Sequence, residues 1–163
     1  MKILGEKSLS AVIIIFLIIL LVLCTLVILT GAVIVIKDLN FYINTNLGRS
    51  LLLMYISTIP AEVLIIQFIG IFKSLKMANI FDIKNLNRLK VAYLSSIIMG
   101  IIYMLNSIVI VIGYNKEFGW MTIYLILSMI ITLVFLIFGI GLVVLSEIYR
   151  KAIQYKEENE STI

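Results

Sequence analysis

One carboxylate lies deep within an apolar stretch of this chain, and it is the residue best suited to chemistry. Glu62 is near the midpoint of an apolar run at residues 50–72, and Pro60 precedes it by two positions. A carboxyl group inside a bilayer is costly to ionise, so such residues are candidates for proton or ion binding. Proline has no N–H, so the carbonyl near Ile56 lacks its helical donor. We therefore expect a kink beside Glu62 that exposes backbone to water or a ligand.

Polar side chains at matching depth in the other apolar runs extend this into a candidate intramembrane site. The site comprises Glu62, Pro60, Tyr103, Asn106, Ser128 and Thr132. Small and hydroxyl residues on one helical face mark helix–helix contacts in lipid. Two interpretations stay open. Glu62 is either protonated and hydrogen-bonded to Asn106 or a hydroxyl as a packing device, or it forms a proton- or cation-responsive site or a polar pocket for a small cationic or amphipathic ligand.

The residue types give little support to enzymatic chemistry. The chain has no histidine and one cysteine, Cys24, which lies inside an apolar run. The commonest general base and the commonest transition-metal ligand are therefore missing. The sequence has no nucleophile–base pair, phosphate-binding loop or metal-ligand spacing. We predict a protein that is not an enzyme, with no catalytic residues, no metal and no cofactor.

The composition and the apolar runs predict an all-α membrane protein. Hydrophobic residues make up 63% and charged residues 13% of the chain, whereas soluble domains carry about 25% charged residues. Each apolar run reaches the roughly 20 residues that a helix needs to cross hydrocarbon. We expect one domain, 1–163, folded as an antiparallel bundle of four transmembrane helices, with a polar loop at residues 37–49. The spans are expected at about 8–36, 50–72, 91–114 and 121–146, with a cytoplasmic loop at 73–90 and a cytoplasmic tail at 147–163.

The distribution of basic residues predicts the orientation in the membrane. Lysine and arginine in short flanking segments favour the cytoplasmic side. Ten lie in the N-terminus, the 73–90 loop and the tail, and three lie between the other spans: Lys37, Arg49 and Lys116. This predicts a multi-pass protein of the cytoplasmic membrane with both termini in the cytoplasm. The abundance of Ile, Asn and Lys points to a bacterial source. The net charge of +4 is a topology signal, so no direct nucleic-acid contact is expected.

The two long cytoplasmic segments are expected to be helical extensions of the spans. Asp82 has the type and place of an N-cap, with a helix starting at Ile83, and Phe81 and Leu86 have the spacing of a hydrophobic staple. Ile148, Ala152 and Tyr155 share a face, so the fourth helix should continue into the cytoplasm. Alternatives remain for both segments. The loop is a capped helix start or a docking surface for a partner, and the tail is a solvated helix end or a recognition segment that pairs with the basic loop.

These two segments also carry a family resemblance. The tail fits the run E-I-F-x-x-A-x-x-x-K-x-E-N-D-L-T-V at Glu147, Ile148, Ala152, Lys156, Glu158, Asn159, Thr162 and Ile163, with Ser161 where Leu is usual. The loop fits F-x-x-x-N-x-x-x-L at Phe81, Asn85 and Leu89, and Ile59-Pro60 is similar too. The chain resembles the small four-span bacterial membrane proteins called domain of unknown function 2975. Glu62 is not part of that pattern.

The resemblance implies a four-helix membrane protein with no known chemistry. It also implies a helix-turn-helix regulator as partner, because such proteins are often encoded beside one. Our first hypothesis is a membrane sensor or regulator that binds a cytoplasmic partner. Its candidate surface comprises Phe81, Asp82, Asn85, Arg88, Leu89, Glu147, Lys156, Glu158 and Asn159. The alternative is a small transporter or a resistance or immunity protein that uses the polar site around Glu62. The small-residue faces could serve one bundle or a homodimer.

Overall fold

Long runs of Ile, Leu and Val become helices here, although these residues also favour strands. In lipid, a helix satisfies every backbone polar group within one segment. The structure is a computed structural model that describes residues 4–76, 82–113 and 119–161, and the regular elements in those residues are all α-helices. They are α1 (Leu4–Lys37), α2 (Leu39–Asn44), α3 (Asn46–Ile56), α4 (Thr58–Lys76), α5 (Ile83–Ile112) and α6 (Gly119–Ser161).

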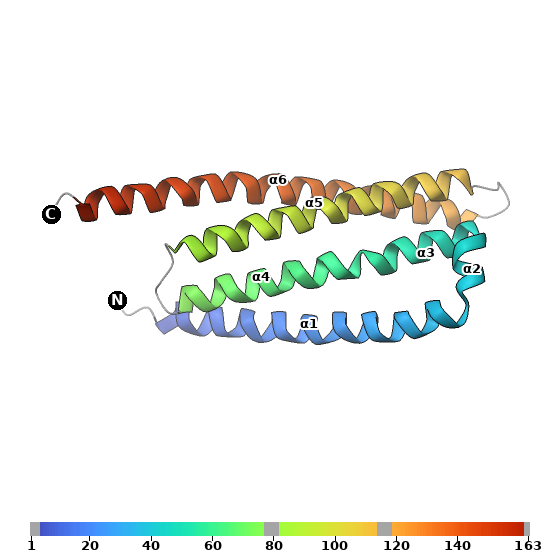
Figure 1. Cartoon of the computed structure of the whole chain (residues 1–163), viewed down its shortest axis with the longest axis horizontal. Coiled ribbons are helices and arrows are strands. Elements are labelled where there is room, and N and C mark those ends of the chain that lie inside the picture. The colour runs from blue at the N-terminus through green and yellow to red at the C-terminus, as the bar shows by residue number, and fades with distance from the viewer. Residues whose placement is uncertain (1–3, 77–81, 114–118, 162–163) are drawn as a thin grey trace.

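Four stretches of the described residues are long and apolar enough to cross a membrane. They are Leu9–Lys37, Asn46–Lys76, Ile83–Ile112 and Thr122–Asn159. Each predicted span falls almost wholly within one of these stretches, so the prediction of a multi-pass, all-helical membrane protein is confirmed. The start of α1 and the end of α6 lie at the same end of the molecule, which is also where α4 ends and α5 begins (Figure 1). We call this the α4–α5 end, and the opposite one the α2 end.

The polar loop expected at residues 37–49 is helical instead, so that prediction is wrong. Residues 39–44 form α2, and α3 begins at Asn46. Thr45 separates the two helices in an extended conformation, and its Oγ1 accepts a hydrogen bond of 2.9 Å from the Gly48 N–H, which caps α3. A Cβ at Gly48 would overlap the Phe41 carbonyl oxygen, so the turn needs glycine at this position. Local capping, which a count of polar residues does not detect, decides the structure of this segment.

The second span is interrupted where Pro60 predicted a break. α3 ends at Ile56 and α4 begins at Thr58, with Ser57 between them. The Ser57 hydroxyl donates a 2.6 Å hydrogen bond to the Met54 carbonyl, and the Thr58 hydroxyl donates one of 2.6 Å to the Tyr55 carbonyl. These hydroxyls donate to backbone carbonyls around the break. Fewer carbonyls there are therefore left poorly hydrogen-bonded inside lipid than would be the case without the two hydroxyls.

The main helices lie in an open row in the order α1, α4, α5 and α6, not in a closed bundle (Figure 1). Within the described residues, the backbone of α6 approaches only that of α5, although the Phe138 ring of α6 has its centroid 6.1 Å from that of Phe68 on α4. α1 packs on α4 with a few contacts to α2 and α3. The four helices therefore do not close on one another, because α1 and α6 do not meet in the described residues. Water does not drive apolar helices together inside lipid. The uniformly apolar α1 is therefore covered as well by acyl chains as by a second helix.

The contact between α5 and α6 is the most extensive in the molecule and is built on small residues. A Cβ at Gly100 would lie 2.8 Å from Leu136 Cδ2, and one at Gly139 would lie 2.9 Å from Ile97 Cγ1. The Ser96 hydroxyl crosses between the helices to donate a 2.8 Å hydrogen bond to the Phe135 carbonyl. Glycines let the backbones approach, and the approach brings the serine within hydrogen-bonding range.

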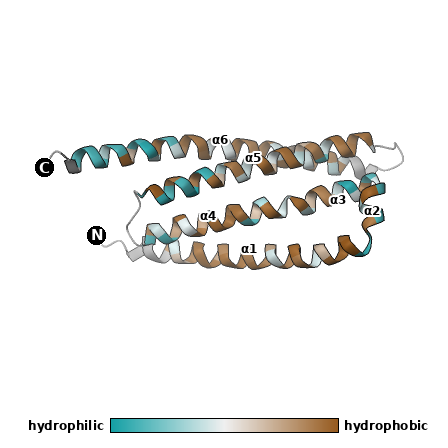
Figure 2. Ribbon diagram, viewed as in Figure 1, coloured by the Kyte–Doolittle hydropathy of each residue, from teal (hydrophilic) through white to brown (hydrophobic). Residues whose placement is uncertain are grey.

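The α4–α5 end agrees with the predicted helix start. Asp82 is extended, and its carboxylate accepts a 3.0 Å hydrogen bond from the Lys84 N–H, so the N-cap and the helix start at Ile83 are confirmed. Leu89, Ala92 and Leu142 form a buried apolar cluster beside this start. α6 then runs past the ends of the other helices, and its last turns are hydrophilic (Figures 1 and 2).

The glycine contact between α5 and α6 is tested by a pair of alanine substitutions. A Cβ at Gly139 meets Ile97, whereas one at Gly141, two residues further along the same helix, meets nothing within 4 Å. Alanine favours a helix over glycine by about 1 kcal/mol at either position, so the difference between the variants isolates the contact. We expect Gly139→Ala to be less stable than Gly141→Ala by about 1–3 kcal/mol, measured by unfolding in one detergent. Equal stabilities would contradict the close packing.

Candidate functional site

Three helices meet at a hydrogen-bonded set of polar side chains in the half of the molecule nearer the α2 end. We call this set the polar layer. It comprises Ser50 of α3, Tyr103, Asn106 and Ser107 of α5, and Ser128 of α6. Ser50, Asn106, Ser107 and Ser128 are all buried. Because unpaired polar groups are costly in lipid, these residues hold α3, α5 and α6 in one register.

Asn106 is the centre of the polar layer. Its side chain is 2% exposed, and its Oδ1 accepts a 2.7 Å hydrogen bond from the Ser50 hydroxyl. Its Nδ2 donates to the Ser128 hydroxyl over 3.3 Å. The Ser128 hydroxyl also donates to the Tyr103 carbonyl over 3.0 Å and lies 3.1 Å from the Ser107 hydroxyl. The amide therefore links α3 to α6 through α5, although α3 and α6 do not themselves pack together.

The structure brings most of the predicted intramembrane site together. Asn106, Ser128 and the Tyr103 backbone share the network, and Thr132 lies one turn along α6, where its hydroxyl donates to the Ser128 carbonyl over 2.9 Å. The Tyr103 ring stacks on Phe135 with centroids 6.2 Å apart, and its hydroxyl lies 3.4 Å from the Ser57 hydroxyl. These four residues thus form one connected group on α5 and α6.

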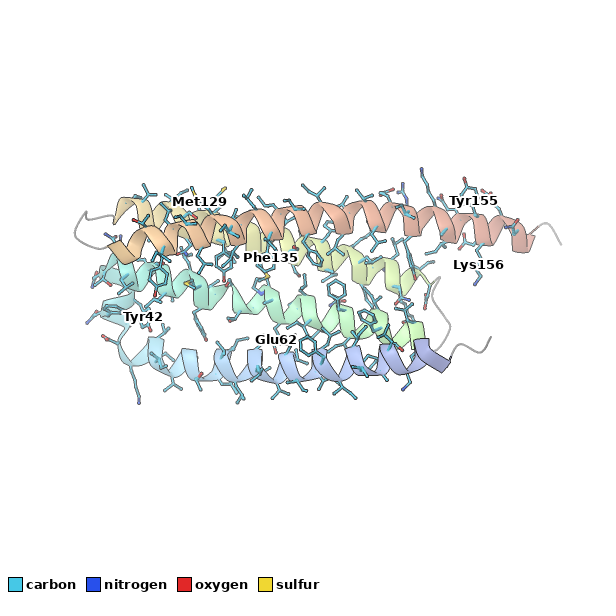
Figure 3. All side chains as sticks on the ribbon, turned by 180° about the vertical axis from the view of Figure 1, so that it is seen from behind. Tyr42, Glu62, Met129, Phe135, Tyr155 and Lys156 are labelled. Carbon is cyan, nitrogen blue, oxygen red and sulfur yellow. The ribbon has the colours of Figure 1, made fainter. Side chains whose placement is uncertain are left out.

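Glu62 lies apart from this group. It is half-buried on α4, between α4 and α1 (Figure 3), close enough to Cys24 of α1 for the two side chains to interact electrostatically. Asn106 accepts a hydrogen bond from Ser50 and donates one to Ser128, so the expected Glu62–Asn106 pair is not formed. None of the described residues forms a hydrogen bond or ion pair with Glu62. Depth matching gives the level of a residue but not the side of the helix that it occupies.

A cavity of about 60 Å³ opens beside the polar layer, and the sequence did not predict it. Its lining is mostly apolar: Asn46, Leu47, Ser50, Leu51, Met54, Ile110, Gly113 and Tyr124. A smaller cavity of about 20 Å³ shares Ser50, Met54, Ile110 and Tyr124 with it and reaches Asn106 and Ser128. About 10–15 Å³ is enough for one water, so the larger cavity can take a small molecule or part of a chain.

Ser50 is a member of the polar layer that the sequence analysis did not single out. Its position at the boundary of the second span sets it outside the depth-matched residues. The available signal is its spacing from Ser57, seven residues later, which puts both hydroxyls on one helical face. Both side chains are buried, at 8% and 3% exposed.

The predicted partner surface is only partly a surface. Asn85 and Leu89 are 2% and 4% exposed, so they pack α5 against its neighbours and cannot contact a partner directly. Arg88 is half-buried against α4, and Phe81 lies outside the described residues. Asp82 is partly exposed at the start of α5. The prediction grouped these residues because they are close in the sequence. In a helix, residues four apart lie on the same face, and for Asn85 and Leu89 that face is turned toward the rest of the protein.

The remaining predicted surface residues lie along the part of α6 that follows Ser146, which we call the α6 extension. Glu147, Lys156, Glu158 and Asn159 are exposed there, and Glu147 forms a 2.8 Å ion pair with Arg150. Ile153, 8% exposed, faces the rest of the protein, whereas Ile148 and Tyr155 are 60% and 65% exposed. Figure 3 shows Tyr155 and Lys156 near the far end of α6. The extension therefore carries an apolar stripe, Ile148 and Tyr155, that the described residues leave uncovered.

The Asn106 network is tested by removing the amide. Asn106→Ala leaves the buried Ser50 hydroxyl without its acceptor and removes one of the three hydrogen bonds of the Ser128 hydroxyl, so we expect a loss of about 1–3 kcal/mol in unfolding free energy in detergent. The control is Asn87→Ala, because Asn87 is exposed on the same helix; it should change stability by less than about 0.5 kcal/mol. If both variants unfold alike, the amide does not hold the three helices together.

Among the described residues there is no group of three or more His, Cys, Asp or Glu side chains that could hold a metal ion. The arrangement instead offers a bonded polar layer, an adjacent apolar cavity, one lone carboxyl group and an exposed helical extension. No curated protein and no solved structure matches the chain. One family model does match it, over residues 4–163, which is nearly the whole length. The chain therefore belongs to the family described as protein of unknown function (DUF2975).

Proposed function

We propose that this protein is a non-enzymatic regulator in the bacterial cytoplasmic membrane, which senses a signal in the bilayer and binds a cytoplasmic partner. The observation that carries the proposal is α6, a single helix of 43 residues. At about 1.5 Å per residue it is roughly 64 Å long, whereas the hydrocarbon core is about 30 Å thick. One rigid element therefore runs from the polar layer to the α6 extension.

The proposed orientation places the α4–α5 end in the cytoplasm. Lys73, Lys76, Lys84 and Lys90 are exposed at that end, and Arg150 and Lys151 follow on α6. Lys37 and Arg49 lie toward the α2 end. The excess of basic residues at one end supports this orientation, with antiparallel spans and both termini inside.

The proposed signal site is the cavity beside the polar layer. It lies between α3 and α6, which share Ser50–Asn106–Ser128 hydrogen bonds but no helix packing. A small apolar or amphipathic molecule in this cavity would push α3 and α6 apart. Because α6 packs on α5 along much of its length, a shift at Ser128 would be carried along the contact between α5 and α6 toward the α6 extension.

The proposed partner site is the exposed stripe of the α6 extension. Ile148 and Tyr155 are seven residues apart and so share one helical face, surrounded by charged side chains. Amphipathic helices commonly bind partners by laying such anchors into an apolar groove. We propose a small helix-turn-helix regulator as the partner, in keeping with the family resemblance.

The partner site is tested by pull-down of that regulator with the full-length protein in detergent. Tyr155→Ala and Ile148→Ala should each weaken binding, by about tenfold or more if the residue is a central anchor. Gln154→Ala is the matched control, since Gln154 is exposed on the same turn away from the stripe. Deletion of the protein should change transcripts controlled by the regulator. No binding and an unchanged transcript profile together would disprove the proposal.

A second candidate function rests on Glu62. A half-buried carboxyl without a described bonding partner, between two membrane-spanning helices, suits a small transporter or a resistance or immunity protein. Ionisable residues within membrane-spanning segments commonly mark proton or ion pathways. The interruption at Ser57 lies close to it on the same span and gives that span a point of movement.

Glu62→Gln separates this alternative from the regulator. The amide keeps the shape of the side chain and removes its titration, so we expect loss of efflux of a cationic amphipathic dye from cells or proteoliposomes, together with its pH dependence. Glu147→Gln is the control, because Glu147 is an exposed carboxylate in the α6 extension. A Glu62→Gln protein that behaves like the parent in efflux, toxin sensitivity and partner binding would remove any role for an ionisable site.

A further inference from the structure

A half-buried arginine bridges α4 and α5 at the α4–α5 end. One nitrogen of Arg88, Nη1, donates to the Gly70 carbonyl over 2.8 Å, to the Ser74 hydroxyl over 2.9 Å and to Asn85 Oδ1 over 2.8 Å. All three acceptors are neutral. A guanidinium carries a full positive charge at any physiological pH, so these bonds orient the charge without neutralising it.

The backbone of α4 is shaped to receive this side chain. A Cβ at Gly70 would lie 2.6 Å from Arg88 Nε and 2.9 Å from Cζ. A larger residue at this position would require the Arg88 side chain to shift. The bonded Nη1 faces α4, and the structure gives Nε and Nη2 no hydrogen bond to any described residue.

No acidic side chain in the described part of the chain balances Arg88. The Asp82 carboxylate caps the start of α5, and Glu147 pairs with Arg150. The sequence between Lys76 and Asp82 contains no acid. The neighbouring charges are positive instead. Lys73 adjoins Ser74, and Lys84 lies one turn before Arg88 on α5, both exposed.

We propose that Arg88, Lys84 and Lys73 bind the phosphate of an anionic phospholipid. A guanidinium with free Nε and Nη2 donors matches two phosphate oxygens at once, and the lysines add charge around it. The site lies where the stretch Asn46–Lys76 ends and the stretch Ile83–Ile112 begins. That is the depth of lipid headgroups, which favours a lipid over a soluble phosphate compound as the source of the anion.

The proposal is tested by native mass spectrometry of the full-length protein, extracted from vesicles of equal phosphatidylcholine and phosphatidylglycerol. The parent should retain phosphatidylglycerol preferentially. Arg88→Gln should lower that preference by about tenfold, since hydrogen bonds to charged groups are the strong ones. Lys84→Gln should lower it severalfold while leaving the Arg88 bonds to α4 in place. Lys151→Gln, which removes an exposed charge on α6, should leave the preference close to the parent value.

The outcomes distinguish a specific lipid-binding site from non-specific attraction between anionic lipid and basic side chains. Should Arg88→Gln fold poorly, Lys84→Gln decides, because its side chain makes none of the contacts between α4 and α5. If Lys84→Gln and Lys151→Gln retain phosphatidylglycerol equally, the charge acts diffusely and the proposal is wrong. Glycerol phosphate is added in a parallel sample. If it displaces the lipid completely, the site is one for soluble phosphate and the assignment to lipid is overturned.

Discussion

Buried polar groups in this protein have no water to bond with, and this constraint organises its helix contacts. Ser96 reaches the Phe135 carbonyl, and Asn106 joins Ser50 to Ser128. Arg88 is tied to the end of α4. Glycines at these contacts remove the side chains that would keep the helices apart. Where a helix has no such groups, as along most of α1, it makes only the contacts that lipid could equally well provide.

The sequence predicted what depends on local residue order. Asp82 is followed by the start of α5, and Pro60 is preceded, three residues earlier, by the break in the second span at Ser57. Both depend on neighbours within a few positions. The prediction of a loop at 37–49 is wrong because it took polar residues as a sign of solvated, irregular backbone. Thr45 instead uses its hydroxyl to cap the start of α3.

The sequence was weaker on how helices face one another. It placed Asn106 and Glu62 at one depth, yet Glu62 lies between α1 and α4, whereas the Asn106 amide bonds Ser50 of α3 and Ser128 of α6. It also assigned Asn85 and Leu89 to a surface that they do not reach. Position along a span follows from counting residues, but rotation about the axis is set by partners elsewhere in the chain. For the same reason the cavity, whose lining comes from three helices, had no signature in any one segment.

The open row of helices has a consequence for biogenesis. The first span is apolar on every side, so lipid can solvate it as soon as it leaves the ribosome. It needs no later segment to cover polar side chains. The third span is different, since Ser96, Asn106 and Ser107 face a helix that is synthesised after it. Until α6 emerges, α5 is a poorly satisfied segment that the insertion machinery must shelter. These polar groups of α5 therefore gain their α6 partners only when the last helix in chain order has been synthesised.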